Sequence, residues 1–392
     1  MRLCGQLSLA PADDGWRAIG DRAAARTRPG IHRSFARRPG QSQPAPTELQ
    51  AHQRLHYLGP GFPADCLAEN QAHHPGRRNW AAPGARKRRG RAVRERFLAV
   101  VNPAAGGGRC GRLAPAAIEK LRAAGVPLEV IESRGPGQAT QLVREAHARG
   151  YCKFLAVGGD GTAYEIVNGL FPGAADGERA ALGFLPLGTG NSFLRDFTDR
   201  GVEHAATAIL GGRRRACDVL RLTHKDGVLH YINLLSIGFT ADVAAITSRK
   251  FKRLGELGYL LGVLTCLARL RRRAFPLRAN GEAEFDRRRC LFLSFSNSKF
   301  TGGKMMIAPM ADTADGLVEY VRWGPIGRLG LIRNLHTLYD GSHLNHPLAS
   351  RRGARRIEFD LEGPVDIMVD GEVLTLHCQR VEVLPGALDV VI

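Results

Sequence analysis

The sequence lacks closely spaced cysteines. No two of its eight cysteines form a Cys-x-x-Cys pair; they are scattered at positions 4, 66, 110, 152, 217, 266, 290 and 378. Without such pairs, neither a structural zinc site nor a disulfide framework is indicated. The cysteine pattern is therefore typical of a protein in a reducing cytosol.

Long hydrophobic runs are also missing. A helix that spans a bilayer needs about 18 or more consecutive apolar residues. The longest candidate, Leu257–Leu270, is interrupted by Gly258 and Gly262 and ends in charge. The N-terminus holds no long apolar segment of the secretory kind. The sequence therefore predicts neither a membrane-spanning helix nor a secretory signal.

Acidic residues are scarce, above all near the N-terminus. The chain has 37 Asp and Glu against 56 Lys and Arg, and residues 1–94 have 6 against 17, which places +11 of the net charge of +19 there. This segment is rich in Arg, Pro, Ala and Gly without a helical or strand period, so we expect a disordered basic tail over 1–94. Its run 86–89 could contact anionic lipid or nucleic acid. Alternatively, translation starts near Val93; no Met lies between Met1 and Met305, so that start would need another codon.

Residues 95–215 alternate short apolar strands with helices. The expected strands are Phe97–Val101, Leu128–Ile131, Phe154–Val157 and Leu182–Leu185. Helices are expected at about 115–124, with Pro115 in the first turn, and after the loop 133–137. This alternation favours an α/β domain with a doubly wound, mostly parallel sheet. In such sheets, ligands bind beyond the carboxyl ends of the strands.

The pattern changes after residue 215. Short segments that read as strands follow at 219–223, 228–237, 290–296, 317–322, 356–361, 365–369, 373–377 and 381–384. Helical stretches interrupt them at about 251–270 and 326–338. We therefore expect a second, mostly antiparallel β domain over 216–392.

The stretch 155–170 joins a strand, a glycine-rich turn and a helix. Its centre is Gly-Gly-Asp-Gly-Thr at 158–162, after which apolar residues recur with helical spacing. Glycine lets a backbone approach a ligand closely, and a helix N-terminus attracts an anion. The Asp160 carboxylate would repel a phosphate unless a cation lies between them, so the turn predicts a phosphate with a divalent metal ion. The alternative is an ordinary tight turn with Asp160 as the helix cap.

Two glycine-rich motifs follow each other in the first domain: Gly-Gly-Asp-Gly-Thr at 158–162, with Glu165 and Asn168, and Pro-Leu-Gly-Thr-Gly-Asn at 186–191. Together they resemble the diacylglycerol kinase catalytic family, which includes bacterial lipid kinases, sphingosine kinases and ceramide kinases. NAD kinases share the first motif, whereas the second narrows the resemblance to lipid kinases. The resemblance covers about 96–388. It implies an ATP- and Mg²⁺-dependent lipid kinase whose active site lies in the cleft between the two domains.

The resemblance also implies a set of nucleotide-binding residues. Backbone N–H groups of the two glycine turns would hold the phosphates of ATP. The implied set is Asn102, Ser133, Gly158, Gly159, Gly161, Thr162, Glu165, Gly188, Thr189 and Asn191. Asp160 would bind the catalytic Mg²⁺, and Glu165 would hold its neighbourhood or share the metal. The alternative for Glu165 is an acid near a helix start that faces the helix dipole.

Two loops of the second domain complete the implied site. Glu372, in Asp-Gly-Glu at 370–372, is implied as the general base for the lipid hydroxyl. An ordinary Glu is a poor base at neutral pH, so burial or a neighbouring acid should raise its pKa. Local sequence alone instead favours a hairpin turn there. Asp312, Asp315 and the Leu317 carbonyl are implied to hold a second Mg²⁺, with an Asp-Gly turn as the alternative.

The lipid acceptor stays open between diacylglycerol and a sphingoid base or ceramide. Sphingosine kinases carry an acid where this chain has Ala244, which disfavours a sphingoid base. However, 248–250 and 253–256 resemble the sphingosine and ceramide kinases. A soluble-substrate kinase of the NAD kinase type and a non-catalytic basic binder of lipid or nucleic acid are the competing hypotheses.

The expected partner is a lipid substrate at a membrane surface. The stretch 251–273 pairs apolar residues with flanking cations, which suits peripheral contact with an anionic interface. A core helix with solvated ends is the alternative. We expect a cytoplasmic protein peripheral to the inner membrane surface, with a homodimer as one arrangement. No specific nucleic acid is expected, since the sequence has no zinc motif or helix-turn-helix signal.

Overall fold

The structure is a computed structural model that describes residues 93–392 except 177–178, 199, 252–254 and 303. At 175–176, 248, 251 and 255–260 it describes the backbone alone. The described residues all lie in one compact unit of the chain. The basic tail expected over 1–94 falls outside them, apart from its last two residues.

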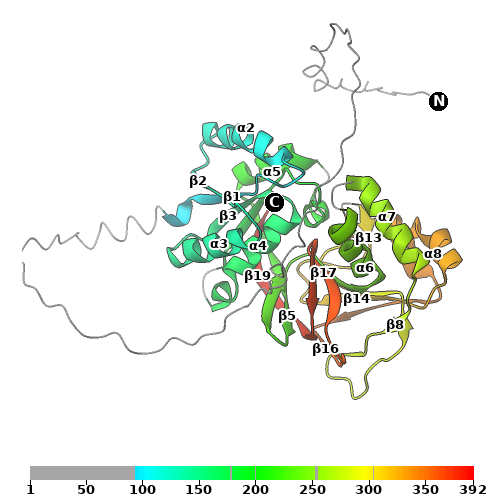
Figure 1. Ribbon diagram of the computed structural model, residues 1–392. Coiled ribbons are helices and arrows are strands. Elements are labelled where there is room, and N and C mark those ends of the chain that lie inside the picture. Colours follow the sequence, from blue (N-terminus) through cyan, green and yellow to red (C-terminus); the bar gives the residue numbers. More distant parts are fainter. Residues whose placement is uncertain (1–92, 177–178, 199, 252–254, 303) are drawn as a thin grey trace, which may run out of the picture. The chain divides into compact units, whose positions relative to one another are not determined.

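A nine-stranded sheet carries the first half of the fold (Figure 1). Its strands are β1 (Phe97–Val101), β2 (Leu128–Glu132), β3 (Lys153–Gly158), β4 (Ala181–Pro186), β5 (Arg214–His224), β6 (Gly227–Tyr231), β9 (Leu277–Ala279), β16 (Arg356–Phe359) and β19 (Cys378–Val391). The first four are parallel in the order β2-β1-β3-β4. β19 adds parallel to β4 and antiparallel to β5 and β16.

Helices cover both faces of the parallel part. Alternate residues of a strand point to opposite faces. Accordingly, Leu98 and Val100 of β1 pack with α3 (Gln138–Ala148) and α4 (Asp160–Leu170). Phe97, Ala99 and Val101 pack with α2 (Arg109–Ala123) and α5 (Gly201–Gly211). The predicted doubly wound α/β domain is confirmed.

The first helix differs from the prediction at its N-terminus. α2 begins at Arg109, six residues before the predicted start, so Pro115 lies inside the helix and not in its first turn. Its first turn packs on the loop after β1, where the Gly111 N–H donates to the Pro103 carbonyl at 3.1 Å. A Cβ at position 111 would meet that same carbonyl oxygen at 3.1 Å. This close approach lets the helix start early.

A six-stranded antiparallel sheet forms the second half. Its order is β15-β14-β11-β7-β17-β18, and the strands are β7 (Leu234–Gly238), β11 (Phe292–Ser296), β14 (Val318–Trp323), β15 (Ala349–Ala354), β17 (Val365–Val369) and β18 (Glu372–Leu376). It packs on β5, β6, β9 and β16 of the first sheet through one apolar cluster that includes Leu222, Phe295 and Ile357. The predicted mostly antiparallel second domain is therefore confirmed as a β sandwich.

Short elements complete this half. Two-stranded sheets pair β8 (Arg273–Ala274) with β10 (Arg289–Cys290) and β12 (Phe300–Thr301) with β13 (Met305–Met306). The helices are α6 (Phe239–Ile246), α7 (Gly255–Ala268), α8 (Arg328–Asn334) and α9 (Thr337–Asp340). The helical stretches expected at 251–270 and 326–338 thus appear as α7 and as the pair α8 and α9.

One predicted strand is split in two. The expected strand 228–237 becomes β6 and β7, with a break at Ile232 and Asn233. The Asp370 carboxylate, from the turn between β17 and β18, accepts the N–H groups of Ile232 (3.0 Å), Asn233 (3.1 Å) and Leu234 (2.9 Å). Because a side chain far along the sequence takes these donors, the ladder breaks there.

The last strand joins the two halves. β19 belongs to the nine-stranded sheet although it ends the chain, and residue 215, where the first domain was expected to end, lies inside β5. The division into 95–215 and 216–392 stays a prediction. Among the described residues, no helix is long and apolar enough to cross a membrane. The six described cysteines are all free.

Candidate active site

The two glycine turns lie against each other. The Gly188 N–H donates to the Gly158 carbonyl at 2.8 Å, and the Asp160 N–H donates to the Gly190 carbonyl at 2.9 Å. A Cβ at position 188 would lie 2.6 Å from the Gly159 nitrogen, a backbone atom that cannot move aside cheaply. The turns that end β3 and β4 therefore form one hydrogen-bonded unit in which glycine is required.

This unit opens into a cavity of about 320 Å³. The cavity also meets the loop after β1 and the β17–β18 hairpin. The lining residues that the sequence indicated are Asn102, Gly159, Asp160, Gly161, Thr162, Gly188, Thr189 and Glu372. Gly158 and Asn191 line a smaller void of about 10 Å³ that also touches Gly159 and Asp160. Both glycine turns thus face a shared cavity, as the sequence predicted.

Asp160 is buried at the start of α4. Both carboxylate oxygens accept the Ser192 N–H at 2.9 Å, and one accepts the Phe193 N–H at 3.4 Å. Burial raises the pKa of this carboxyl, and the hydrogen bonds oppose that shift in part. Asp160 thus ties α4 to the short helix at Phe193–Asp196. Its role as a metal ligand stays a prediction.

Glu372 reaches the cavity from a tight hairpin. Val369 and Glu372 are paired, and the two turn residues Asp370 and Gly371 have positive φ of 46° and 90°. These values match the two-residue turn that Asp-Gly favours. A Cβ on Gly161 would lie 2.8 Å from Glu372 Oε1, so this carboxylate lies against the first turn of α4. The loop is therefore the hairpin turn that local sequence favoured, and its Glu372 side chain also lies at the cavity.

Asp370 attaches this hairpin to the segment between β6 and β7. It is fully buried and accepts the three backbone N–H groups described above. Burial raises the pKa of Asp370 to about 7, and the nearby Asp160 carboxylate acts in the same direction. The first carboxylate of the Asp-Gly-Glu loop is therefore structural, while the second faces the cavity.

Thr162 leaves a polar atom without a partner at the cavity. Its buried Oγ1 makes no hydrogen bond in the structure, and a Cβ at position 158 would collide with it. A buried hydroxyl without a partner costs free energy unless a ligand satisfies it. With the bare backbone of the glycine turns beside it, this side of the cavity suits the oxygens of a phosphate chain.

Glu165 and Ser133 lie outside the lining of this cavity. The Glu165 carboxylate accepts the N–H groups of Gly137 (3.0 Å) and Ala139 (2.9 Å), so it caps the N-terminus of α3. The Ser133 N–H and Oγ both donate to the Val101 carbonyl, at 2.9 and 3.4 Å. Their predicted contacts with ATP stay predictions.

The implied second metal loop borders a different cavity. The Asp312 carboxylate pairs with Arg215 at 2.7 Å and also accepts the Ala314 N–H at 3.0 Å. Asp315 accepts the N–H of Leu317 at 2.9 Å and borders a cavity of about 470 Å³. Burial raises the pKa of Asp315, and nearby carboxylates add to the shift. Within the described residues, no three His, Cys, Asp or Glu side chains form a metal-binding group.

The sequence left other lining residues unassigned. They are Ala105, Gly106, Gly190, Asn233, Thr301, Gly302, Met368, Asp370 and Gly371. Asn168 also acts here without lining the cavity, because its amide exchanges two hydrogen bonds with the His230 backbone at 2.8 and 2.9 Å. Gly190, Asp370 and Gly371 lie inside the recognised motifs, whereas positions such as Thr301 and Met368 had no local signal.

Comparisons with known proteins identify the family of this chain. The family described as the diacylglycerol kinase catalytic domain matches residues 96–222, and the YegS C-terminal NAD kinase beta sandwich-like domain matches 233–392. A protein of Mycobacterium tuberculosis (strain ATCC 25618 / H37Rv) named "Diacylglycerol kinase" is 27% identical over 298 residues, which are 75% of this chain and 94% of the relative. A Pseudomonas aeruginosa (strain PAO1) protein named "Probable lipid kinase YegS-like" is 33% identical over 279 residues, 70% of this chain and 88% of the relative.

A solved structure shares the fold. The crystal structure of a diacylglycerol kinase from Bacillus anthracis str. Sterne superposes with a TM-score of 0.56 at 21% identity, over 76% of this chain and 96% of that one. The glycine turns, the hairpin Glu and both matched domains lie on one chain in the expected order. The chain therefore belongs to the diacylglycerol kinase catalytic family of lipid kinases, and it is a phosphotransferase.

Proposed function

We propose that this protein transfers the γ-phosphoryl group of ATP to the hydroxyl of diacylglycerol or a related lipid alcohol, with the help of Mg²⁺. The observation that carries the proposal is the single cavity in which the glycine turns of β3 and β4 face Glu372. Phosphoryl transfer needs positioned phosphates, charge neutralisation and a base near the acceptor hydroxyl. Each of these requirements has a candidate group in that cavity.

The nucleotide side is built mostly from backbone. N–H groups at the start of α4 point toward the cavity end of the helix, where its dipole favours an anion. Thr162 Oγ1 is the donor without a partner, and the Thr189 hydroxyl is a second candidate. Asn191 Nδ2 donates to the Gly188 carbonyl at 3.1 Å, which stiffens the second turn. The triphosphate of ATP would lie along these groups.

Asp160 is the residue that would hold the catalytic Mg²⁺. Mg²⁺ keeps several waters and takes few carboxylates, so one buried acid beside the phosphates fits its needs. When bound, the ion neutralises charge on the phosphate oxygens. A second Mg²⁺ on Asp312, Asp315 and the Leu317 carbonyl would be remote from this chemistry, since Asp315 borders the other cavity.

Glu372 is the proposed general base. Its carboxylate lies against Gly161 in the first turn of α4, beside the phosphate-binding groups. There it would accept the proton of the lipid hydroxyl as the hydroxyl oxygen attacks the γ-phosphorus. Asp370 keeps the hairpin at the right depth through its three backbone hydrogen bonds.

A neutral lipid alcohol suits this chain better than a sphingoid amine. An acceptor with an ammonium group calls for a carboxylate beside it, and position 244 of α6 is alanine. The one acid of α6, Asp242, is paired with Arg273 at 2.6 Å and 2.7 Å through both oxygens. This pairing favours diacylglycerol over sphingosine. Such a lipid resides in a bilayer, so we place the protein at the cytoplasmic surface of the membrane.

A lipid panel tests the proposal. The purified full-length protein would receive labelled ATP, Mg²⁺ and, in separate reactions, diacylglycerol, sphingosine, ceramide or NAD. We expect label in phosphatidic acid above all, and none after addition of EDTA. Transfer to NAD alone, or to sphingosine in preference to diacylglycerol, would replace the proposed acceptor. Asp160→Asn serves as the inactive reference.

A further inference from the structure

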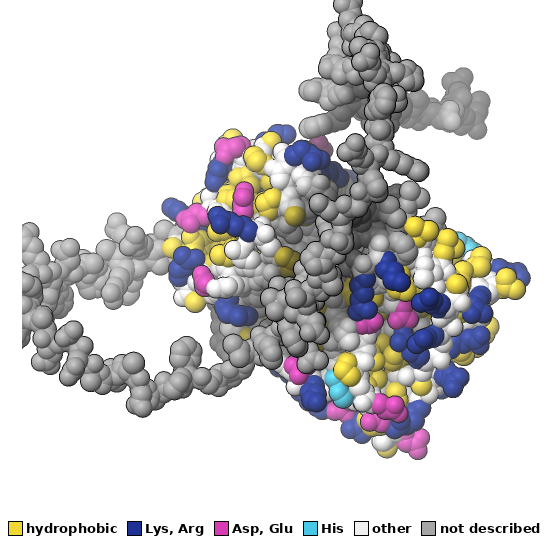
Figure 2. Space-filling view, in the orientation of Figure 1, with side chains coloured by type: hydrophobic (Ala, Val, Ile, Leu, Met, Phe, Trp, Pro, Cys, Tyr) yellow, Lys and Arg dark blue, Asp and Glu magenta, His cyan; other side chains and the backbone are white. Residues whose placement is uncertain are grey.

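The outer surface of α7 and α8 is apolar. Leu261 and Leu264 of α7 are exposed, and so are Leu329 and Ile332 of α8, Leu335 just after it and Tyr339 of α9. We call these six side chains the α7–α8 face. Leu329 is 79% exposed, the highest value among the exposed large hydrophobic residues. In the space-filling view, hydrophobic side chains gather over this region, at the upper right of the molecule, with Lys and Arg beside them (Figure 2).

A cluster of buried apolar side chains lies beneath the face. Cys266, Leu331 and Leu338 are buried in the cluster beneath the helices. α8 therefore has apolar side chains on both its inner and outer sides. Exposed apolar side chains that gather on one surface mark a contact site for a further apolar partner. In the described part of the chain, nothing covers the outer side.

Cations border the face. Residues 261–274 and 324–339 hold six Arg and no Asp or Glu. Arg273 pairs with Asp242, and Arg328 donates to the Leu267 and Ala268 carbonyls at 3.1 and 3.0 Å. The other four are exposed, at positions 269, 271, 272 and 333. The exposed side chains at the rim are therefore mostly cations, although one acid, Asp340, lies next to Tyr339.

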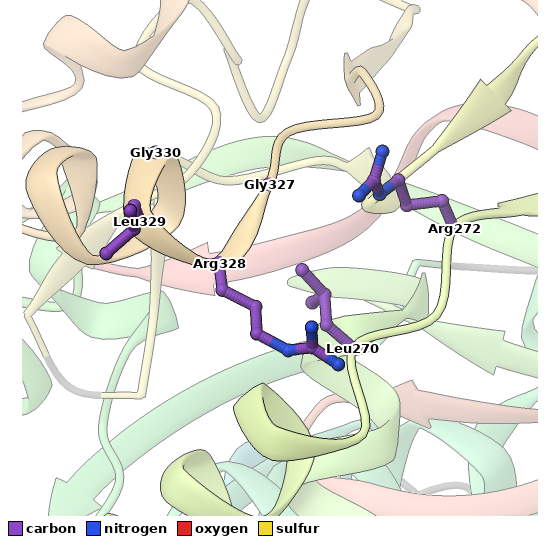
Figure 3. Close-up of a pocket in the computed structure, with 6 residues that line it drawn as sticks. All are labelled: Leu270, Arg272, Gly327, Arg328, Leu329 and Gly330. Carbon is purple, nitrogen blue, oxygen red and sulfur yellow. The ribbon is translucent and has the colours of Figure 1, made fainter.

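A cavity of about 410 Å³ lies at this rim, between the segment after α7 and the start of α8. Figure 3 shows that the side chains of Arg272 and Arg328 extend from different segments beside it, with Leu270 between them and Leu329 on the helix that starts at Arg328. Cationic groups and apolar side chains thus share one concave edge. A phospholipid presents the complementary pair, an anionic headgroup and acyl chains.

We propose that the α7–α8 face docks this protein on a bilayer of anionic phospholipid. Charge complementarity selects this occupant. The N-terminal tail carries a net +11 and would be repelled by the Arg rim. A second copy that met this face with its own would set Arg against Arg. An anionic membrane accepts both the apolar side chains and the cations.

The apolar cluster beneath the face also reaches the active-site cavity. Met368 packs against the apolar cluster beneath α7 and α8, and it lines the cavity that holds Asp160 and Glu372. Packed apolar side chains therefore connect the docking surface with the wall of the active-site cavity. This link rests on the proposed lipid kinase function, because it gives an acceptor with acyl chains a reason to enter from that side.

Vesicle sedimentation tests the docking without any turnover. Full-length protein is spun with phosphatidylcholine vesicles that either contain or lack phosphatidylglycerol, and no ATP is added. The test variant is Leu329→Glu with Ile332→Glu. Its matched control is Leu113→Glu with Leu210→Glu on α2 and α5, where Leu210 is 50% exposed and Ile332 is 55% exposed. We expect the test variant to lose about tenfold or more in binding to anionic vesicles, and the control to bind like wild type.

The cationic rim has its own variant. Arg271→Gln with Arg272→Gln should weaken binding to anionic vesicles by about fivefold for each Arg, with little change on neutral vesicles. Equal losses in the Leu329/Ile332 variant and its control would overturn the proposal, as would unchanged binding in both test variants. A wild-type dimer in solution that Leu329→Glu dissociates would assign the face to a second copy instead.

Kinase assays separate docking from chemistry. With diacylglycerol in anionic vesicles, the Leu329→Glu and Ile332→Glu variant should lose turnover in parallel with binding. With a short-chain diacylglycerol in free solution, it should match wild type. If wild type phosphorylates no lipid yet docks, the proposed function fails while the docking face stands. If turnover is normal and vesicle binding is absent, the docking face fails alone.

Discussion

At the residue scale, Asp160 is a carboxyl group whose surroundings disfavour ionisation. Its burial raises the pKa of the carboxyl, so ionisation of this side chain costs folding stability. The group stabilises the fold most below the unfolded-state pKa of about 3.9, and that contribution is lost as the pH rises toward the higher folded-state pKa. Asn at position 160 would keep one acceptor for the Ser192 N–H and carry no charge. We therefore expect Asp160→Asn to melt at the same or a higher temperature than wild type at pH 8, with this advantage gone at pH 4, in thermal melts followed by circular dichroism.

The same substitution should remove activity. An amide holds a divalent cation far less well than a carboxylate does, so we expect no measurable transfer from ATP to lipid in a labelled-ATP assay. The thermal melts above show whether the variant is folded. Turnover close to wild type in a folded Asp160→Asn protein would contradict the metal role.

Glu372 offers a test of the base. Glu372→Gln keeps the size of the side chain at the hairpin and removes its ability to take a proton. Loss of a general base lowers kcat by about 100- to 10,000-fold, and we expect a fall in that range with little change in the KM for ATP. Glu362→Gln, at an exposed position in the turn between β16 and β17, is the control and should leave both constants unchanged. A Glu372→Gln enzyme with wild-type kcat would leave the hairpin with a structural role only.

At the element scale, the two glycine turns must touch for the cavity to exist. Alanine at 188 would place its Cβ 2.6 Å from the Gly159 nitrogen and push the turns after β3 and β4 apart. A displacement of about 1 Å in a positioned group costs about 100-fold in rate. We expect Gly188→Ala to lower kcat/KM for ATP by roughly that factor and to destabilise the fold by about 1–3 kcal/mol. Steady-state kinetics and urea unfolding measure both effects.

Gly363→Ala is the matched control for that variant. A Cβ at position 363 meets no atom within 4 Å, and the residue lies in the turn between β16 and β17. The control should keep wild-type kinetics and stability. Equal behaviour of the two variants would mean that the contact between the turns does not matter for catalysis.

The elements that the sequence could predict are those set by local signals. β1, β3 and β4 are mostly apolar runs, each followed by a glycine-rich turn, and each lies where it was expected, within a residue or two. The start of α2 escaped prediction because Pro115 is a good first-turn residue, and only the packing of Gly111 on Pro103 shows that the helix begins earlier. Local sequence was therefore enough to identify the glycine turns, whereas tertiary packing determined where α2 begins.

The site residues also divide into those that local sequence indicates and those that only tertiary contacts reveal. Asp160 and Glu372 were indicated because each sits in a compact motif, and the convergence of two turns follows from parallel strands that end at one edge of a sheet. The role of Asp370 was hidden, because its three hydrogen-bond donors lie more than 130 residues earlier in the chain. That long-range contact also divides β6 from β7. No local pattern carries such information.

At the scale of the whole molecule, the feature that the sequence missed is the return of β19. Only 381–384 was expected as a strand there, yet β19 runs over 14 residues and pairs with β4, β5 and β16. Along β19, Val381 packs in the cluster under the second sheet, while Leu388 packs in the cluster under α3 and α4. One strand therefore contributes to both cores, and strand pairing over such a distance in the sequence leaves no local signature.

This shared strand predicts that the two halves unfold together. Leu388 is fully buried, and Leu388→Ala should cost about 2–5 kcal/mol of unfolding free energy through the cavity it leaves. If β19 couples the cores, hydrogen exchange under native conditions should show equal losses of protection in β4, which pairs with β19 beside the change, and in β11, which belongs to the second sheet. The exposed Leu210→Ala change should shift neither strand by more than about 0.5 kcal/mol. Protection of β11 that stays at the wild-type level in Leu388→Ala would show that the second sheet holds its structure independently, and that the C-terminal strand only docks the two cores.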